Sequence, residues 1–148
     1  MAALEREAAQ HIERAVIHMT TESDDQKGAV REEPSAPSMT GRCHCGHVGY
    51  RAQGPILKQS YCSCRGCQRA TGTLEAPFIT VSRDAFAVTA GTPSLFRAES
   101  GEGCDAHGRW AFCPRCGTQL FWDGDGRDQI DIFAGTLDDT SLFDAGGE

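Results

Sequence analysis

The spacing of eight cysteines is the feature that most constrains how this chain of 148 residues can fold. Seven of them fall into three short motifs and one stands alone: Cys43 and Cys45; Cys62, Cys64 and Cys67; Cys113 and Cys116; and Cys104. Thiols this close in sequence can reach one metal ion from a tight turn, and four thiolates complete a tetrahedral zinc site. We therefore predict a domain with a thin hydrophobic core that metal ions help to hold together.

Two of the motifs are pairs, Cys43-His44-Cys45-Gly46 and Cys113-Pro114-Arg115-Cys116-Gly117. Each pair ends in a glycine, which lets the backbone bend where amide groups can donate to sulfur. We predict that the four thiols of the two pairs hold one structural zinc, which would join the beginning of the domain to its far end. Two sets of buried thiols, or an oxidised pair, are the alternative.

The central motif, Cys62-Ser63-Cys64-Arg65-Gly66-Cys67, offers three thiols, one fewer than a closed zinc site needs. We predict a second zinc there, with one position open to water or to a substrate sulfur. Arg65 and Arg69 would favour thiolates and attract an anionic ligand, unless they are ordinary solvated surface charges. In the alternative, a fourth side chain closes the site and makes it purely structural. The candidates for that fourth ligand are Cys104, which lies in a glycine-rich stretch, His107, His44 and His47.

The composition of the chain argues against some classes of function. The formal net charge of −7 argues against a nucleic-acid partner, because phosphate binding relies on clustered Lys and Arg. No stretch approaches the roughly 18 apolar residues of a membrane span, and the N-terminus has no secretory signal pattern. We therefore expect a cytoplasmic protein, in whose reducing surroundings clustered cysteines bind metal more often than they form disulfides.

The chain divides near Met39. Residues 1–39 contain no cysteine, and their composition predicts a partly helical or disordered N-terminal extension, whereas residues 40–148 predict a mainly β zinc domain. Short β-like runs broken by Gly, Pro and Asp predict strands at residues 47–52, 56–62, 78–82, 85–89, 94–98, 109–113, 118–122 and 129–134. A hairpin turn is expected at residues 123–126, and one short helix from about Arg65 to Gly72.

Four segments together resemble the glutathione-dependent formaldehyde-activating family, which shares its domain with centromere protein V. They are Gly41-Arg42-Cys43-His44-Cys45-Gly46, residues 62–72, Phe112-Cys113-Pro114-Arg115-Cys116-Gly117-Thr118, and Gly135-Thr136-Leu137-Asp138-Asp139. The resemblance covers about residues 40–142. It implies a β-tent fold of two small antiparallel sheets around zinc, and the same assignment of ligands to two ions. It also implies carbon–sulfur lyase activity, with the zinc at Cys62, Cys64 and Cys67 associated with catalysis.

The implied substrate is a small-molecule adduct of a thiol and an aldehyde. The thiol of glutathione would take the open position, lose its proton and add to formaldehyde, giving S-hydroxymethylglutathione. Arg65 or Arg69 would pair with a glutathione carboxylate. No residue stands out as a general base, although His44 and His47 titrate in the right range. The alternatives are a zinc-stabilised binding module or glutathione carrier without catalysis, and a redox-responsive protein in which the triplet and Cys104 cycle between zinc and disulfide.

Overall fold

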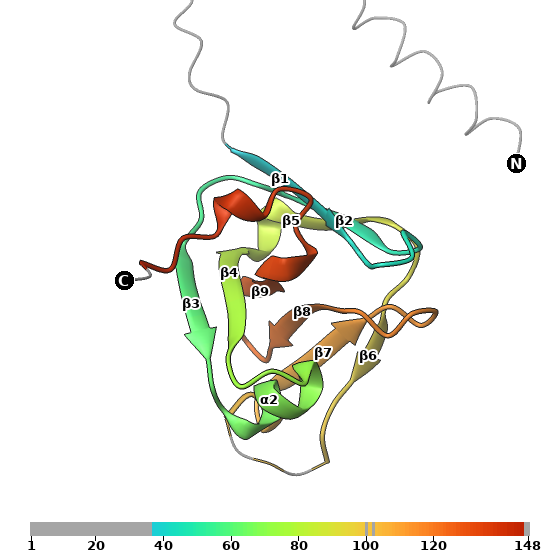
Figure 1. The fold of residues 1–148 in the computed structure, drawn as a ribbon, viewed down its shortest axis with the longest axis vertical. Helices are drawn as coiled ribbons and strands as arrows, with labels where there is room; N and C mark the ends of the chain where they lie inside the picture. Colours follow the sequence, from blue (N-terminus) through green and yellow to red (C-terminus); the bar gives the residue numbers. More distant parts are fainter. Residues whose placement is uncertain (1–36, 100, 102, 147–148) are drawn as a thin grey trace, which may run out of the picture. The chain divides into compact units, whose positions relative to one another are not determined.

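The computed structural model describes residues 37–99, 101 and 103–146, which form two antiparallel sheets and one short α-helix (Figure 1). The three-stranded sheet has the order β1-β2-β5, with β1 at Ser38–Arg42, β2 at Gly49–Gln53 and β5 at Phe86–Ala90. The six-stranded sheet has the order β3-β4-β9-β8-β7-β6. Its strands are Lys58–Cys62 (β3), Ala76–Ser82 (β4), Ser94–Phe96 (β6), Gly108–Phe112 (β7), Gln119–Gly124 (β8) and Gln129–Phe133 (β9). The prediction of a mainly β fold with two antiparallel sheets is confirmed.

Each predicted strand corresponds to an observed one within a few residues, but β1 was not predicted. It lies across the division that the sequence suggested near Met39, and Met39 itself is only 1% exposed. Its alternation of exposed and buried residues is typical of a strand with one face on a core. The partly helical or disordered extension predicted for residues 1–39 lies outside the described residues as far as residue 36.

The strand period of two gives the six-stranded sheet two different faces. On one face, Ile79, Val81, Ile130 and Ile132 pack with Tyr50 and other residues of the three-stranded sheet to form the larger core. On the other face lies a smaller apolar cluster made of Cys67, Ala76, Phe78, Trp110, Trp122 and Phe133. The alternation therefore separates the residues that join the two sheets from those that lie near the short helix.

Helix α2 (Arg65–Thr71) lies near the second face, at the end of the molecule where β3 and β7 are seen in Figure 1. Its start is fixed because the sulfur of Cys64, the N-cap residue, accepts a hydrogen bond from the Cys67 amide at 3.4 Å. It ends at Gly72, which adopts a φ of 72° and donates its amide to Gln68. The predicted helix at residues 65–72 is thus confirmed.

Four short 3-10 turns complete the described chain: η1 (Arg83–Ala85), η2 (Gly103–Asp105), η3 (Ala134–Thr136) and η4 (Thr140–Leu142). Turn η2 is the segment that matters for the site, because it contacts α2 and carries Cys104. Within the described residues, no helix has both the length and the hydropathy needed to span a bilayer.

Candidate metal centres and adjoining cavities

The two cysteine pairs occupy turns of the same design, one following β1 and the other following β7. In each turn the first cysteine bonds through its amide to a carbonyl five residues later, Cys43 to Val48 and Cys113 to Thr118, both at 2.9 Å. Gly46 and Gly117 each adopt a φ of 75°, a conformation that a residue with a Cβ rarely takes. The His44 amide also donates to the Thr118 hydroxyl at 3.1 Å and links the two turns.

These turns bring four thiols, the first thiol group, within one ligand sphere: Cys43, Cys45, Cys113 and Cys116. Their sulfurs lie within 4.8 Å of one another, with 3.6 Å between Cys43 and Cys45 and 3.7 Å between Cys45 and Cys113. Sulfurs bound tetrahedrally at about 2.3 Å from a zinc ion are roughly 3.8 Å apart, so the geometry fits zinc. Hydrogen bonds from Thr118 lower the pKa of the Cys116 thiol to about 5, which favours a ligating thiolate.

A second thiol group lies at the α2 end of the six-stranded sheet and consists of Cys62, Cys64, Cys67 and Cys104. Cys62 ends β3, Cys64 caps α2, and Cys67 lies inside the helix with none of its surface exposed. The three thiols predicted to share an ion are therefore brought together. Their sulfurs and that of Cys104 all lie within 4.8 Å of one another, so this group too fits a tetrahedral ion.

The structure places a fourth thiol at this group, whereas we expected three thiols and one open position. Cys104 lies on η2, its carbonyl accepts a hydrogen bond from the Trp122 indole at 3.2 Å, and its sulfur lies 3.6 Å from that of Cys67. Of the competing ligands considered from sequence, Cys104 joins the group, whereas His44, His47 and His107 belong to neither thiol group. With all four sulfurs on one ion, no coordination position remains free.

The thiols of the second group lie so close together that they shift one another's pKa values. The Cys67 thiol donates to Cys104, and this hydrogen bond lowers the pKa of Cys104 to about 6. The same bond and burial raise the pKa of Cys67 far above its usual range, and burial raises that of Cys62. Four neighbouring thiolates repel one another, so the full set ionises readily only around a cation.

A small cavity of about 170 Å³ exposes part of the second thiol group. Cys62 and Cys104 lie in its wall together with seven other residues: Lys58, Ser60, Phe78, Thr80, Trp122, Arg127 and Asp131. The charged residues come from three different segments, so only the folded sheet brings them to the sulfurs. The cavity can admit a small polar group next to two of the thiols.

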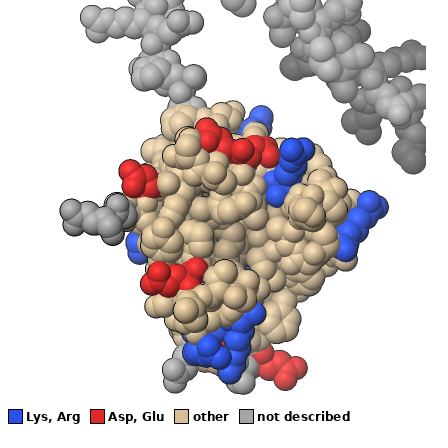
Figure 2. Space-filling model, in the orientation of Figure 1, with Lys and Arg blue, Asp and Glu red and all other residues tan. Residues whose placement is uncertain are grey.

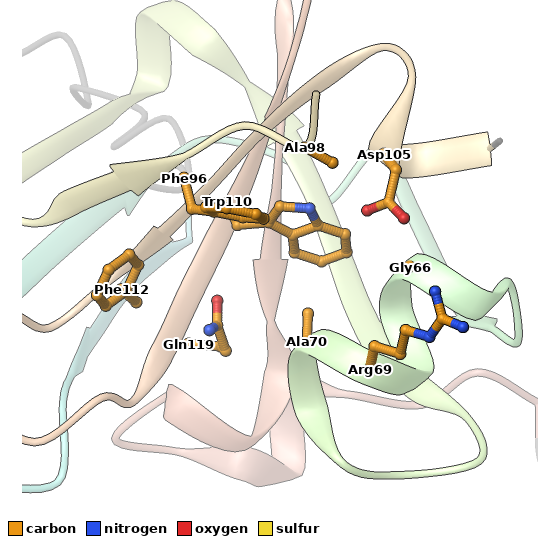
Figure 3. Close-up of a pocket in the computed structure, with 9 residues that line it drawn as sticks. All are labelled: Gly66, Arg69, Ala70, Phe96, Ala98, Asp105, Trp110, Phe112 and Gln119. Carbon is orange, nitrogen blue, oxygen red and sulfur yellow. The ribbon is translucent and has the colours of Figure 1, made fainter. Parts of the chain in front are cut away.

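A larger cavity, of about 520 Å³, lies beside α2 on the same face of the sheet (Figure 3). Its lining includes Gly66 and Arg69 of α2, Asp105 of η2, and Trp110 of β7. Gly66 lies between Cys64 and Cys67 in sequence, and Asp105 follows Cys104. The larger cavity therefore adjoins the second thiol group through these two residues, and none of the four thiols is among its lining residues.

The comparisons with known proteins agree with this arrangement. The family model described as "glutathione-dependent formaldehyde-activating enzyme" matches residues 38–146. The chain belongs to this family. A crystal structure of a Rhodobacter sphaeroides protein is similar in fold, with 22% identity, a TM-score of 0.54, and coverage of 68% of this chain and 88% of that one. A search of curated proteins found no match.

The family match extends slightly beyond the segments that carried the resemblance, and it includes β1 at its beginning. It also supports a function related to glutathione and formaldehyde and a small-molecule substrate. Three of the four segments that carried the resemblance supply the cysteines of the two thiol groups, and Cys104 is the one member that lies outside those segments.

Of the two arginines proposed to contact a substrate carboxylate, only Arg69 lines the larger cavity. Arg65 instead donates to the Gln68 side chain at 2.7 Å, on the exposed side of α2. Figure 2 shows basic side chains gathered at the end of the molecule where Figure 1 places α2, with acidic ones close by. Basic side chains are thus present near the second thiol group despite the negative net charge of the chain.

Sequence reasoning did not single out Lys58, Arg127 or Asp131. One carboxylate oxygen of Asp131 accepts a hydrogen bond from Thr80 at 2.6 Å, and the other accepts one from the Arg127 guanidinium at 2.7 Å, so the carboxylate links Arg127 to β4. Arg127 also lies over the Trp122 ring, 5.3 Å from its centroid. The alternation Ile130-Asp131-Ile132 was one available signal, because it puts a carboxylate on the face opposite the larger core.

Proposed function

We propose that this chain is a zinc-dependent carbon–sulfur lyase acting on the adduct of glutathione, or a related thiol, with an aldehyde such as formaldehyde. The observation that carries the proposal is that Cys62 and Cys104 line a cavity that also contains the cationic side chains of Lys58 and Arg127. The family description supports the substrate class. The eight cysteines are free thiols, so each is available as a metal ligand.

In this proposal the first thiol group holds a structural zinc and the second holds the zinc used in the reaction. When bound, the second zinc would lower the pKa of a coordinated substrate thiol and keep it nucleophilic. The reaction forms one bond between the thiol sulfur and the carbonyl carbon, and the thiol proton is transferred to the carbonyl oxygen. The lyase direction breaks that bond and returns the proton to sulfur.

Entry of a substrate thiol requires one of the four cysteines to leave, and we assign that role to Cys104. Cys62 belongs to the β3 ladder, and both Cys64 and Cys67 are fixed by α2. Cys104, in contrast, is carried by a three-residue turn. The hydrogen bond that the Trp122 indole donates to the Cys104 carbonyl would hold this turn in its resting position. Cys104 would thus close the site in the resting protein and yield to a visiting thiol.

The cationic side chains of the two cavities would hold the rest of the substrate. Lys58 is exposed at the small cavity, and Arg127 is oriented there by Asp131. Arg69 lies in the wall of the larger cavity, where it can pair with a carboxylate. Glutathione carries two carboxylates, so cations on both sides of the sulfurs suit it.

A zinc-stabilised binding module, or a glutathione carrier, is the second candidate. The four-thiol composition of the second group favours it, because four thiolates complete the coordination of zinc without a substrate. In a binding module with a closed site, glutathione would not disturb the second ion, whereas in a carrier it would. In neither case would the chain accelerate a reaction.

Exchange spectroscopy of the formaldehyde–glutathione equilibrium separates the two candidates. We expect the zinc-loaded protein to accelerate exchange, Cys64→Ser to abolish the acceleration, and Cys104→Ser to retain both the second zinc and the acceleration. The cobalt-substituted protein should change its charge-transfer bands when glutathione is added. If exchange is not accelerated and the bands do not change, the binding module is the correct function. Loss of the second metal in Cys104→Ser would refute an exchangeable Cys104.

A further inference from the structure

The larger cavity has an aromatic wall that neither formaldehyde nor glutathione needs. Trp110 forms one side and is only 2% exposed, while Phe96 and Phe112 extend the wall toward solvent (Figure 3). The small side chains of Ala70 and Ala98 also line the cavity and leave space beside the rings. Formaldehyde has no carbon beyond its carbonyl, and glutathione is a hydrophilic peptide, so neither would bury this apolar surface.

The rings are held in place by the sheet. Phe96 of β6 pairs in register with Trp110 of β7, and Trp110 stacks on Phe133, with 6.1 Å between ring centroids and 25° between ring planes. Because Phe96 is 55% exposed despite lining the cavity, it is available to a ligand. A flat apolar group entering there would meet a rigid surface and lose little of its binding energy to ordering side chains.

Polar atoms of the cavity wall indicate what else the ligand carries. The side-chain oxygen of Gln119 is buried without a hydrogen-bond partner in the described part of the chain. A buried acceptor without a partner is costly, but this oxygen has almost no accessible surface, so a donor on a ligand would reach it only after the Gln119 side chain turns toward the cavity. Arg69, on the α2 side, forms no ion pair with any described residue and is free to meet a carboxylate.

We propose that the larger cavity is a subsite for an aromatic group, so that the substrate is the thiol adduct of an aryl-bearing aldehyde rather than of formaldehyde alone. This assignment rests on the proposed function for the reacting sulfur, because the cavity borders the second thiol group through Gly66 and Asp105. The chemistry is unchanged: the thiol adds to the aryl aldehyde, the carbon–sulfur bond forms, and the thiol proton is transferred to the carbonyl oxygen.

Two stable thioethers test the subsite. We expect the zinc-loaded full chain to bind S-benzylglutathione at least about tenfold more tightly than S-methylglutathione in calorimetry, because its phenyl ring would be buried against the aromatic wall. Phe96→Ala should remove this preference. Leu95→Ala is the matched control, because Leu95 neighbours Phe96 on β6, is 53% exposed and does not line the cavity. Ala98→Leu, which fills the cavity, should also remove the preference.

The outcomes keep the two proposals separate. Equal affinity for the two thioethers, or a preference that Phe96→Ala leaves intact, overturns the aromatic subsite even when formaldehyde–glutathione exchange is accelerated. A second outcome is a preference that depends on Phe96 while the exchange of neither formaldehyde nor benzaldehyde adducts is accelerated. This outcome supports the larger cavity as a binding subsite for an aromatic group. It overturns the lyase activity, and with it the assignment of an aryl adduct as the substrate. Absence of both the preference and the acceleration overturns both proposals.

Discussion

The sulfurs of Cys67 and Cys104 lie 3.6 Å apart, although the two residues are separated by 37 positions in sequence. One is fixed inside α2 and fully buried, and the other is carried by the short turn η2. This contact joins the helix to the segment between β6 and β7. Within the second thiol group, Cys67 is therefore held more rigidly than Cys104. The rigidity of a ligand decides how much it contributes to the free energy of metal binding.

Cys67→Ser should therefore weaken zinc binding at the second group more than Cys104→Ser does. Four-ligand structural zinc binds with about 10–16 kcal/mol, so one rigid thiolate contributes roughly 3 kcal/mol, or about 100-fold in affinity. The loss for Cys104 should be smaller, because its turn must be ordered for it to bind. Competition with a chromophoric chelator measures both affinities. Cys116→Ser, which alters only the first group, is the control, and equal losses for Cys67 and Cys104 would contradict the argument.

Loss of the first thiol group should destabilise the whole domain. Cys43 follows β1 of the three-stranded sheet and Cys113 follows β7 of the six-stranded sheet, so an ion bound there ties the two sheets together. We expect Cys113→Ser to lose one zinc per chain and several kcal/mol of unfolding free energy, which a thermal melt with metal analysis detects. Arg115→Ala, at an exposed position of the same turn, should keep its zinc and its melting temperature.

Much of the fold and of the metal groups could be predicted because both depend on local patterns. Short cysteine spacings predict which thiols share an ion, and alternation predicts strands such as Gln129–Phe133. The fourth member of the second group was harder, since Cys104 has no neighbouring cysteine and reaches Cys67 only because β6 and β7 fold beside α2. For the same reason the cavity residues Lys58, Arg127 and Asp131 were missed. Their proximity follows from strand order, which no local pattern encodes.

Asp123 is expected to stabilise the six-stranded sheet through two arginines. Its carboxylate accepts from Arg83 at 2.5 Å and from Arg109 at 2.8 Å, and the Asp123 side chain is only 13% exposed. Asp123→Asn should lower the unfolding free energy by about 1–2 kcal/mol, a figure reduced for the partial exposure of both guanidiniums. Asp125→Asn is the matched control because its pair with Arg97 is exposed. Chemical denaturation should show the smaller effect for Asp125, and the reverse order would be evidence against this account.

Gly41 is required for close packing between β1 and the segment around η3. A Cβ at Gly41 would lie 2.1 Å from the Tyr50 hydroxyl oxygen and 2.6 Å from the Thr136 carbonyl oxygen. Tyr50 has little freedom to move, because its ring is buried and its hydroxyl bonds to Thr136 at 2.7 Å. We therefore expect Gly41→Ala to destabilise the domain by about 1–3 kcal/mol, as overpacking of a rigid core does.

Gly135 provides the control, because it lies outside this contact, six residues before Ser141. A Cβ at Gly135 would meet no atom within 4 Å, so Gly135→Ala should be nearly neutral. Equilibrium unfolding in urea compares the two variants directly. Equal stability would mean that Tyr50 and Thr136 can move apart at little cost.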